Sequence, residues 1–143
     1  MATSFVSYKG HGFWSWDGYL EHLLFLLSEA IGPAPDESWL NDVRAHWREQ
    51  ATGSFSAWIH PDLDEYITSE EKRSVILALI EQVVSSPSVT QEVLETAQLM
   101  RRLLLGAITT TESSPLDYMV SGKHPYEWWV RRNTTIDLPE IEH

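Results

Sequence analysis

The sequence predicts an all-α or mainly α protein: an irregular bundle of four main helices with a structured acidic loop and an aromatic C-terminal segment. Apolar residues recur at helical spacing in four separate stretches, and glycine, proline or serine follows each stretch. The chain has 143 residues, 43% of them hydrophobic, which is enough to bury a core without a metal or a disulfide. We therefore expect residues 1–143 to form one helical domain.

The first 15 residues are polar and aromatic, with Gly10 and Gly12 among them. This composition predicts an extended arm or a short strand rather than a helix. Trp14 and Trp16 lie at its end, where large aromatic side chains would anchor the arm to the bundle.

The first helix is expected to run from Ser15 or Asp17 to Ile31 and to lie at the centre of the bundle. Gly32 and the proline after it supply the stop. Phe25 and its neighbour widen the apolar face almost all round, which is typical of a central helix. The inner positions recur at helical spacing: Leu20, Leu23, Leu24, Leu27 and Ile31.

The second helix is expected from about Glu37 to Ala51, with Asp36 or Ser38 as its N-cap and Gly53 beyond its end. Its spacing predicts a buried stripe of Trp39, Leu40, Val43 and Trp47. The opposite face, expected in water, carries Asp42, Arg44, Arg48 and Glu49.

The third helix is expected from about Glu70 to Val84. Thr68 and Glu71 have the spacing of a capping box, in which each side chain satisfies a free backbone N–H group of the first turn. Acidic residues in that turn also complement the helix dipole.

The fourth helix is expected to begin after Ser88, which forms a second capping-box pattern with Gln91, and to end near Leu105, before Gly106. Residues 107–143 mix strand-forming residues with three prolines and one glycine that favour turns. Their aromatic residues, Tyr126, Trp128 and Trp129, are expected to dock on the bundle as a short helix or strand.

Charge and composition exclude several classes of protein. Ten basic residues against 21 acidic ones give a net charge of −11, which repels nucleic acid and anionic lipid but speeds encounter with basic proteins. The absence of cysteine excludes disulfides, thiolate zinc sites and cysteine nucleophiles. No apolar run approaches the roughly 20 residues of a membrane span, and the N-terminus lacks the pattern of a secretory signal. We expect a soluble cytoplasmic protein without a cofactor.

An acidic loop between the second and third helices is the best candidate for a binding site. The 23 residues between Arg48 and Lys72 include six carboxylates and no lysine or arginine. Acids beside aromatic residues on a loop suit a cationic partner, with the aromatics as anchors. The residues that we expect to contact it are Trp58, His60, Asp62, Asp64, Glu65 and Tyr66.

Other chemistry is conceivable in the same region. His60, Asp62 and Asp64 could hold a metal ion in a small metal-dependent hydrolase, and His11, His22 and His46 could join them, although no thiolate or paired helical histidine supports such a site. Neighbouring carboxylates could serve acid–base hydrolysis if their environments separated their pKa values. A ligand pocket lined by tryptophans is a third possibility. Ser69 and Lys72 match the spacing of a Ser-x-x-Lys nucleophile, but a helix start already accounts for the serine.

Several segments of the chain resemble a group of small bacterial immunity proteins encoded beside polymorphic toxins. The likeness covers roughly residues 11–122. It is carried by His11-Gly-Phe-Trp14 with Asp17 and Leu20-Glu21, Trp39-Leu40 with Asp42, Arg44 and Trp47, Gly53-Ser-Phe55, His60-Pro-Asp-Leu-Asp-Glu65, and Pro115-Leu-Asp-Tyr-Met119. The resemblance implies a helical, non-catalytic inhibitor that binds one cognate toxin domain and blocks its active site. The family does not fix the binding surface, so the acidic loop remains the candidate, and the toxin is expected to be basic.

Overall fold

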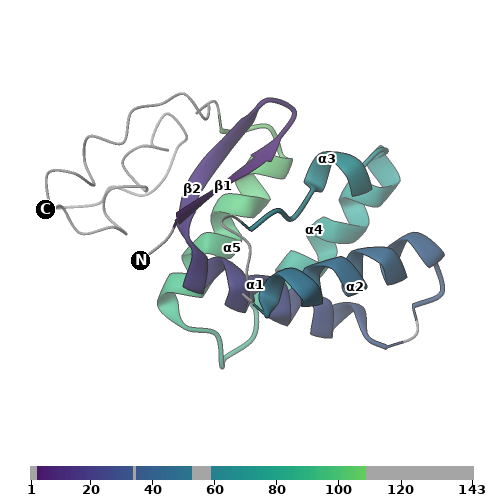
Figure 1. Ribbon diagram of the computed structural model, residues 1–143, viewed down its shortest axis with the longest axis horizontal. Coiled ribbons are helices and arrows are strands. Elements are labelled where there is room, and N and C mark those ends of the chain that lie inside the picture. Colours follow the sequence, from purple (N-terminus) through teal and green to yellow (C-terminus); the bar gives the residue numbers. More distant parts are fainter. Residues whose placement is uncertain (1–2, 34, 53–58, 109–143) are drawn as a thin grey trace, which may run out of the picture.

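The computed structural model describes residues 3–33, 35–52 and 59–108. They are mostly helical, as predicted, with a small sheet of two strands (Figure 1). The elements in chain order are β1 (Thr3–Tyr8), β2 (His11–Trp16), α1 (Asp17–Ile31), α2 (Ser38–Ala51), α3 (Leu63–Tyr66), α4 (Glu70–Val84) and α5 (Gln91–Leu104). The predicted aromatic segment after Ile108 lies outside the described residues.

Helix α1 lies centrally and packs against α2, α4, α5 and β2, which confirms the sequence-based expectation. Its inner leucines are fully buried: Leu20, Leu23, Leu24 and Leu27. Burying each such side chain stabilises the fold by about 1.5–3 kcal/mol. The expectation that the apolar face runs almost all round is wrong at Phe25, which is 43% exposed and has the Arg48 guanidinium 5.7 Å from its ring centroid.

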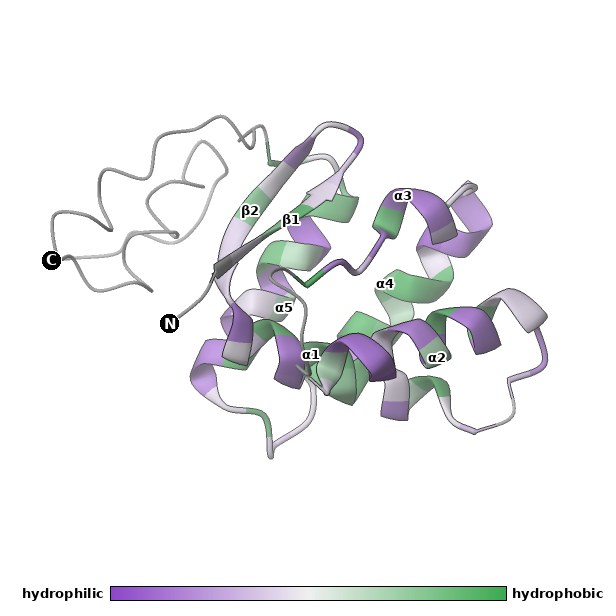
Figure 2. Cartoon of the chain, viewed as in Figure 1, coloured by the Kyte–Doolittle hydropathy of each residue, from purple (hydrophilic) through white to green (hydrophobic). Residues whose placement is uncertain are grey.

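Helix α2 buries Val43 and Trp47 fully and Trp39 partly, as its spacing predicts. Figure 2 shows hydrophobic and hydrophilic positions alternating along it, as expected for a helix with one face on the core. The predicted N-caps are wrong. Glu37 holds the N-cap position in an extended conformation, and its carboxylate accepts a hydrogen bond from Trp39 Nε1 at 3.0 Å.

Helices α4 and α5 are the predicted third and fourth helices. The predicted bounds of α4 are confirmed, and the predicted C-terminal end of α5 is correct to within one residue. Both predicted capping boxes are wrong by one or two residues. Ser69 caps α4 and accepts from the Lys72 amide at 3.2 Å, and Thr90 caps α5 and accepts from the Val93 amide at 3.3 Å. In both helices the N-cap is therefore a hydroxyl residue one or two positions later in the chain than predicted.

The N-terminal arm is a β-hairpin rather than a single strand. β1 and β2 pair antiparallel from Thr3 opposite Trp16 to Tyr8 opposite His11. The two-residue turn has positive φ at both positions, Lys9 at 54° and Gly10 at 87°, a geometry that matches the right-handed twist of the strands. Trp14 and Trp16 pack partly buried against the core, as predicted.

None of the helices in the described ranges is long and apolar enough to cross a membrane.

The hairpin requires glycine at position 12. A Cβ atom added to Gly12 would overlap the Val6 carbonyl oxygen and come within 2.8 Å of the Phe5 ring. We expect Gly12→Ala to destabilise the protein by about 2–4 kcal/mol, measured by urea unfolding, because the strands must move apart. Gly18→Ala is the control: no atom lies within 4 Å of its added Cβ, so it should be neutral or stabilise α1 by up to about 1 kcal/mol. Equal stability of the two variants would contradict the strand packing.

Candidate functional site

A buried serine connects the hairpin, α1 and the loop that leads to α3. Ser4 Oγ donates a hydrogen bond to Asp17 Oδ1 at 2.7 Å and accepts one from the Ile59 amide at 2.9 Å. Asp17 is the first residue of α1, and Ser4 is fully buried in β1. The loop therefore meets the helical bundle at a fixed point.

Helix α2 holds the next residues of the loop through three side chains. Trp47 Nε1 donates to the Pro61 carbonyl at 2.9 Å, and Gln50 Oε1 accepts from the His60 amide at 2.7 Å. His46 Nε2 lies 2.7 Å from the His60 carbonyl oxygen. Because a carbonyl oxygen only accepts, Nε2 must carry the hydrogen.

The same nitrogen of His46 lies 2.8 Å from Asp62 Oδ2, so the imidazole joins α2 to the residue that precedes α3. Asp62 has a left-handed backbone conformation (φ 55°, ψ 50°), which aspartate tolerates better than most residues. Its carbonyl accepts from the amides of Glu65 and Tyr66 and so closes the single turn of α3.

Three apolar side chains at a spacing of four residues attach this segment to the core: Ile59, Leu63 and Ile67 are 4%, 1% and 4% exposed. The loop is therefore partly helical and has a buried side as well as an exposed one. The regular spacing of these residues was a sequence signal for this attachment, hidden by the many acids between them.

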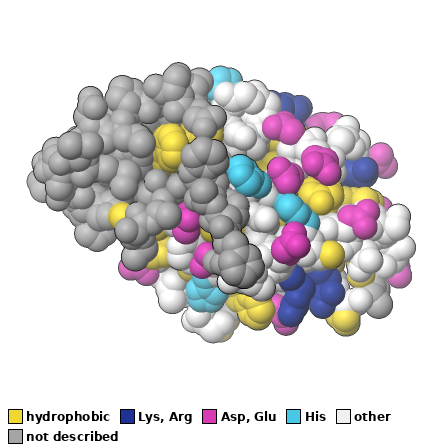
Figure 3. All heavy atoms as spheres, viewed as in Figure 1, with side chains coloured by type: hydrophobic (Ala, Val, Ile, Leu, Met, Phe, Trp, Pro, Cys, Tyr) yellow, Lys and Arg dark blue, Asp and Glu magenta, His cyan; other side chains and the backbone are white. Residues whose placement is uncertain are grey.

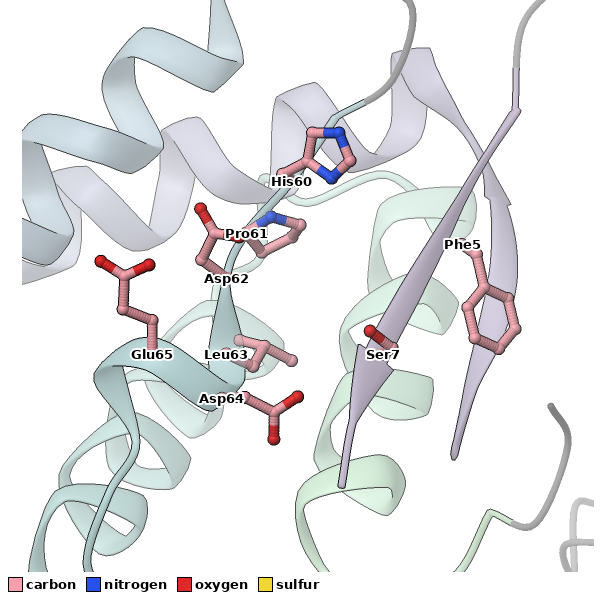
Figure 4. Close-up of a pocket in the computed structure, with 8 residues that line it drawn as sticks. All are labelled: Phe5, Ser7, His60, Pro61, Asp62, Leu63, Asp64 and Glu65. Atoms are coloured by element: carbon pink, nitrogen blue, oxygen red, sulfur yellow. The ribbon is translucent and has the colours of Figure 1, made fainter. Parts of the chain in front are cut away.

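The acidic side chains of the segment point in two directions. Figure 4 shows Leu63 and Asp64 turned toward β1, whereas Asp62 and Glu65 point away from it on the other side of the ribbon. Asp64 Oδ1 accepts from the Lys9 amide at 2.9 Å and so ties α3 to the hairpin turn. A hollow of about 200 Å³ between β1 and α3 is lined by Phe5, Ser7, His60, Pro61, Asp62, Leu63, Asp64 and Glu65.

Tyr66 marks the place where carboxylates from two elements converge. Partial burial raises the pKa of its phenol, and the charges of four acids raise it further: Glu65, Asp62, Asp42 and Glu49. The His46 ring lies 5.7 Å from the Tyr66 ring, between the helix and the loop. We call these four acids the acidic face. Figure 3 shows carboxylate and histidine side chains gathered on this part of the surface, over α2 and the segment around α3.

No lysine or arginine of the described residues forms a salt bridge with the acidic face. Within residues 3–33, 35–52 and 59–108, the salt bridges of Arg48, Arg73 and Arg101 go to glutamates elsewhere, and Asp62 pairs only with His46. The face thus presents negative charge to any partner that approaches it.

Only some of the predicted site residues lie on the acidic face. Asp62 and Glu65 are exposed on the acidic face and Tyr66 is half-buried between its acids, while His60 is exposed on the rim of the hollow. Asp64 is exposed but turned to the hairpin, and Trp58 lies outside the described residues. Sequence reasoning placed Asp42 and Glu49 on a solvated helix face and considered His46 only as a further metal ligand, so it assigned none of the three to the binding surface. Their position relative to the α3 segment depends on how the chain folds back: His46 contacts Asp62 and Tyr66, and the charges of Asp42 and Glu49 act on Tyr66.

The geometry does not favour the metal-dependent alternative. Asp62 and Asp64 point to opposite sides of α3, and in the part of the chain that the structure describes no three histidine or acidic side chains are close enough to hold a metal ion together.

Comparison of the chain with protein-family models, with curated proteins and with solved structures gives no match. The assignment of function therefore rests on the residues and their arrangement.

Removing the Ser4 hydroxyl should loosen the loop. Ser4→Ala leaves the Ile59 amide without its acceptor and Asp17 without its donor, which should cost about 1–3 kcal/mol in the free energy of unfolding. Ser28→Ala is a matched control: Ser28 is also fully buried, but its hydroxyl donates only to the Phe25 carbonyl of its own helix. We expect that control to change stability by less than about 0.5 kcal/mol in urea titrations. Equal losses would rule out a special role for Ser4.

The convergence of acids on Tyr66 can be measured through its ionisation. Asp42→Asn with Glu49→Gln should lower the pKa of Tyr66, followed by NMR of the ring carbons, because two of the charges that oppose phenolate formation are removed. Tyr19, whose pKa is raised by burial and by Glu92, should not change. Since the folded-state pKa is raised, the stability from Tyr66 is present below its ordinary value near 10 and is lost as the pH rises past the folded value. Tyr66→Phe should remove this loss of folding stability at alkaline pH.

Proposed function

We propose that the protein is a cytoplasmic immunity protein that binds a cognate basic toxin domain and blocks its active site. The observation that carries the proposal is the acidic face: four carboxylates from α2 and the α3 segment whose charges act on one half-buried tyrosine, and which form no salt bridge with a lysine or arginine of the described residues. The resemblance of the chain to small immunity proteins and its net charge of −11 support the same function.

The face suits fast capture of a cationic partner. Negative charge concentrated on one surface steers a basic protein toward it and raises the association rate. Asp62 and Glu65 would pair with lysines or arginines of the toxin, and Tyr66 would supply rigid aromatic contact area, a frequent hot-spot residue. Removing one member of a buried interfacial charge pair costs about 2–5 kcal/mol.

The hollow beside α3 adds a feature that flat acidic surfaces lack. Its walls include the apolar side chains of Phe5 and Leu63, and its rim carries carboxylates. A lysine or arginine side chain has the complementary form, an apolar stem with a charged end. Asp64 has a mainly structural role in this proposal, since its carboxylate holds the hairpin turn.

The proposal is tested by co-expression with the product of the adjacent gene, followed by purification of the complex and measurement of its affinity. A stable complex in which this chain abolishes the partner's toxicity is expected. Failure of the two chains to associate, with both folded, would exclude the proposal.

The surface is tested with two triple variants that change the net charge equally. Asp42→Asn, Asp62→Asn and Glu65→Gln remove charge from the acidic face, and asparagine keeps the left-handed backbone at position 62. We expect this variant to weaken the complex at least about 100-fold, or roughly 2.7 kcal/mol. Glu81→Gln, Glu92→Gln and Glu95→Gln on α4 and α5 should weaken it less than about threefold, through net charge alone. Similar losses in both variants would show that another surface binds the partner.

A further inference from the structure

We propose that a second hollow, between the hairpin turn and the end of α5, binds a carboxylate attached to a small apolar group. The hollow has a volume of about 250 Å³, and residues of β1, β2, α4 and the C-terminal end of α5 line it. It is a different cavity from the one beside α3, and the proposal does not depend on the toxin.

The floor of this hollow is apolar. Tyr8, Leu103, Leu104 and Ile108 line it, and each is at most 5% exposed, so their side chains belong to the core and present only a small surface to the cavity. Such a floor excludes water from an alkyl or aromatic group placed on it, which favours binding of that group.

Basic side chains lie around this floor: Lys9 and His11 from the hairpin and Arg73 from α4. Lys9 and Arg73 are two of only 10 lysines and arginines in a chain with 21 acidic residues. The Lys9 ammonium lies 5.3 Å from the Tyr8 ring centroid and makes no ion pair with a carboxylate of the described residues. Among the described residues, no carboxylate therefore competes with a ligand for the charge of Lys9.

Arg73 already has two partners in the protein, but its guanidinium can still bind the carboxylate of a ligand. It donates to the Leu104 carbonyl at 3.4 Å, which holds it over the end of α5, and it pairs with Glu70. The Glu70 side chain is 78% exposed, so this pair is screened by water and is easily exchanged. A guanidinium has five N–H donors in a planar fork that matches a carboxylate.

Size and charge together select the class of ligand. A hollow of about 250 Å³ is smaller than the pockets of about 300–1,000 Å³ that hold drug-sized molecules. The net charge of −11 opposes a dianion more strongly than a monoanion, which favours a carboxylate over a phosphate ester. The carboxylate could belong to a free short-chain acid or to an acidic side chain beside an apolar residue of a peptide.

The test uses NMR titrations of the full chain with hexanoate and with a capped leucyl-glutamate dipeptide. We expect saturable shifts centred on the amides of Lys9, Arg73 and Leu104 for at least one probe, and the tighter probe identifies the source of the carboxylate. Hexanol at the same concentrations should give no saturable shifts. Absence of saturable binding by both acids at up to about 50 mM, or equal binding of hexanol, would overturn the proposal.

Variants separate the hollow from general charge effects. Lys9→Asn keeps a residue that tolerates positive φ in the turn, and with Arg73→Gln it should weaken binding of the acid at least tenfold. Arg101→Gln and Arg102→Gln on α5 are the control with the same change in net charge, and they should alter binding less than twofold. Arg73→Gln could unfold the protein, which would be seen as a loss of chemical-shift dispersion of the amide signals. In that case the single variant Lys9→Asn, in the exposed turn, should still weaken binding about threefold or more. Unchanged affinity in that single variant would overturn the role of the hairpin.

Discussion

The arrangement of the acidic face depends on the two hydrogen bonds of the Ser4 hydroxyl. The hydroxyl accepts from the amide of Ile59 and donates to the carboxylate of Asp17, so one buried group joins the hairpin, the start of α1 and the loop. A buried polar group without a partner is costly, and each of these three groups provides a partner for another. The loop must therefore lie where the hairpin and α1 meet.

The loop beyond that point is satisfied by side chains instead of by regular secondary structure. Trp47, Gln50 and His46 of α2 bond to its backbone, and the carboxylate of Asp64 bonds to the backbone of the hairpin turn. These bonds fix the exposed acids without neutralising them. Because the acidic side chains are held in place before a partner arrives, binding would cost little conformational entropy of the loop. An acidic stretch that looks unstructured by composition thus becomes a preformed surface.

The four long helices could be predicted because their stability comes from local periodicity and a buried face, whereas the single turn of α3 was placed in a loop. The start of α1 at Asp17 is one of the two predicted starts, and both bounds of α4 follow from patterns within the segment. The hairpin was not identified, because Lys9-Gly10 is a weaker turn signal than asparagine-glycine and a two-stranded sheet gains its stability from packing on other elements. The caps of α4 and α5 were misplaced because several hydroxyl residues adjoin the start of each of these two helices. The contribution of Asp42, His46 and Glu49 to the site depends on contacts between α2 and α3, which no local pattern contains.

The claim that the loop is held firmly can be tested through native-state hydrogen exchange of two amides. The amides of Ile59 and His60 donate to side-chain oxygens, those of Ser4 and Gln50. If these bonds hold the segment to the bundle, the amides of Ile59 and His60 should exchange at rates within about tenfold of the central amides of α2. Exchange at the rate of an unstructured peptide, while α2 remains protected, would contradict a preformed acidic face.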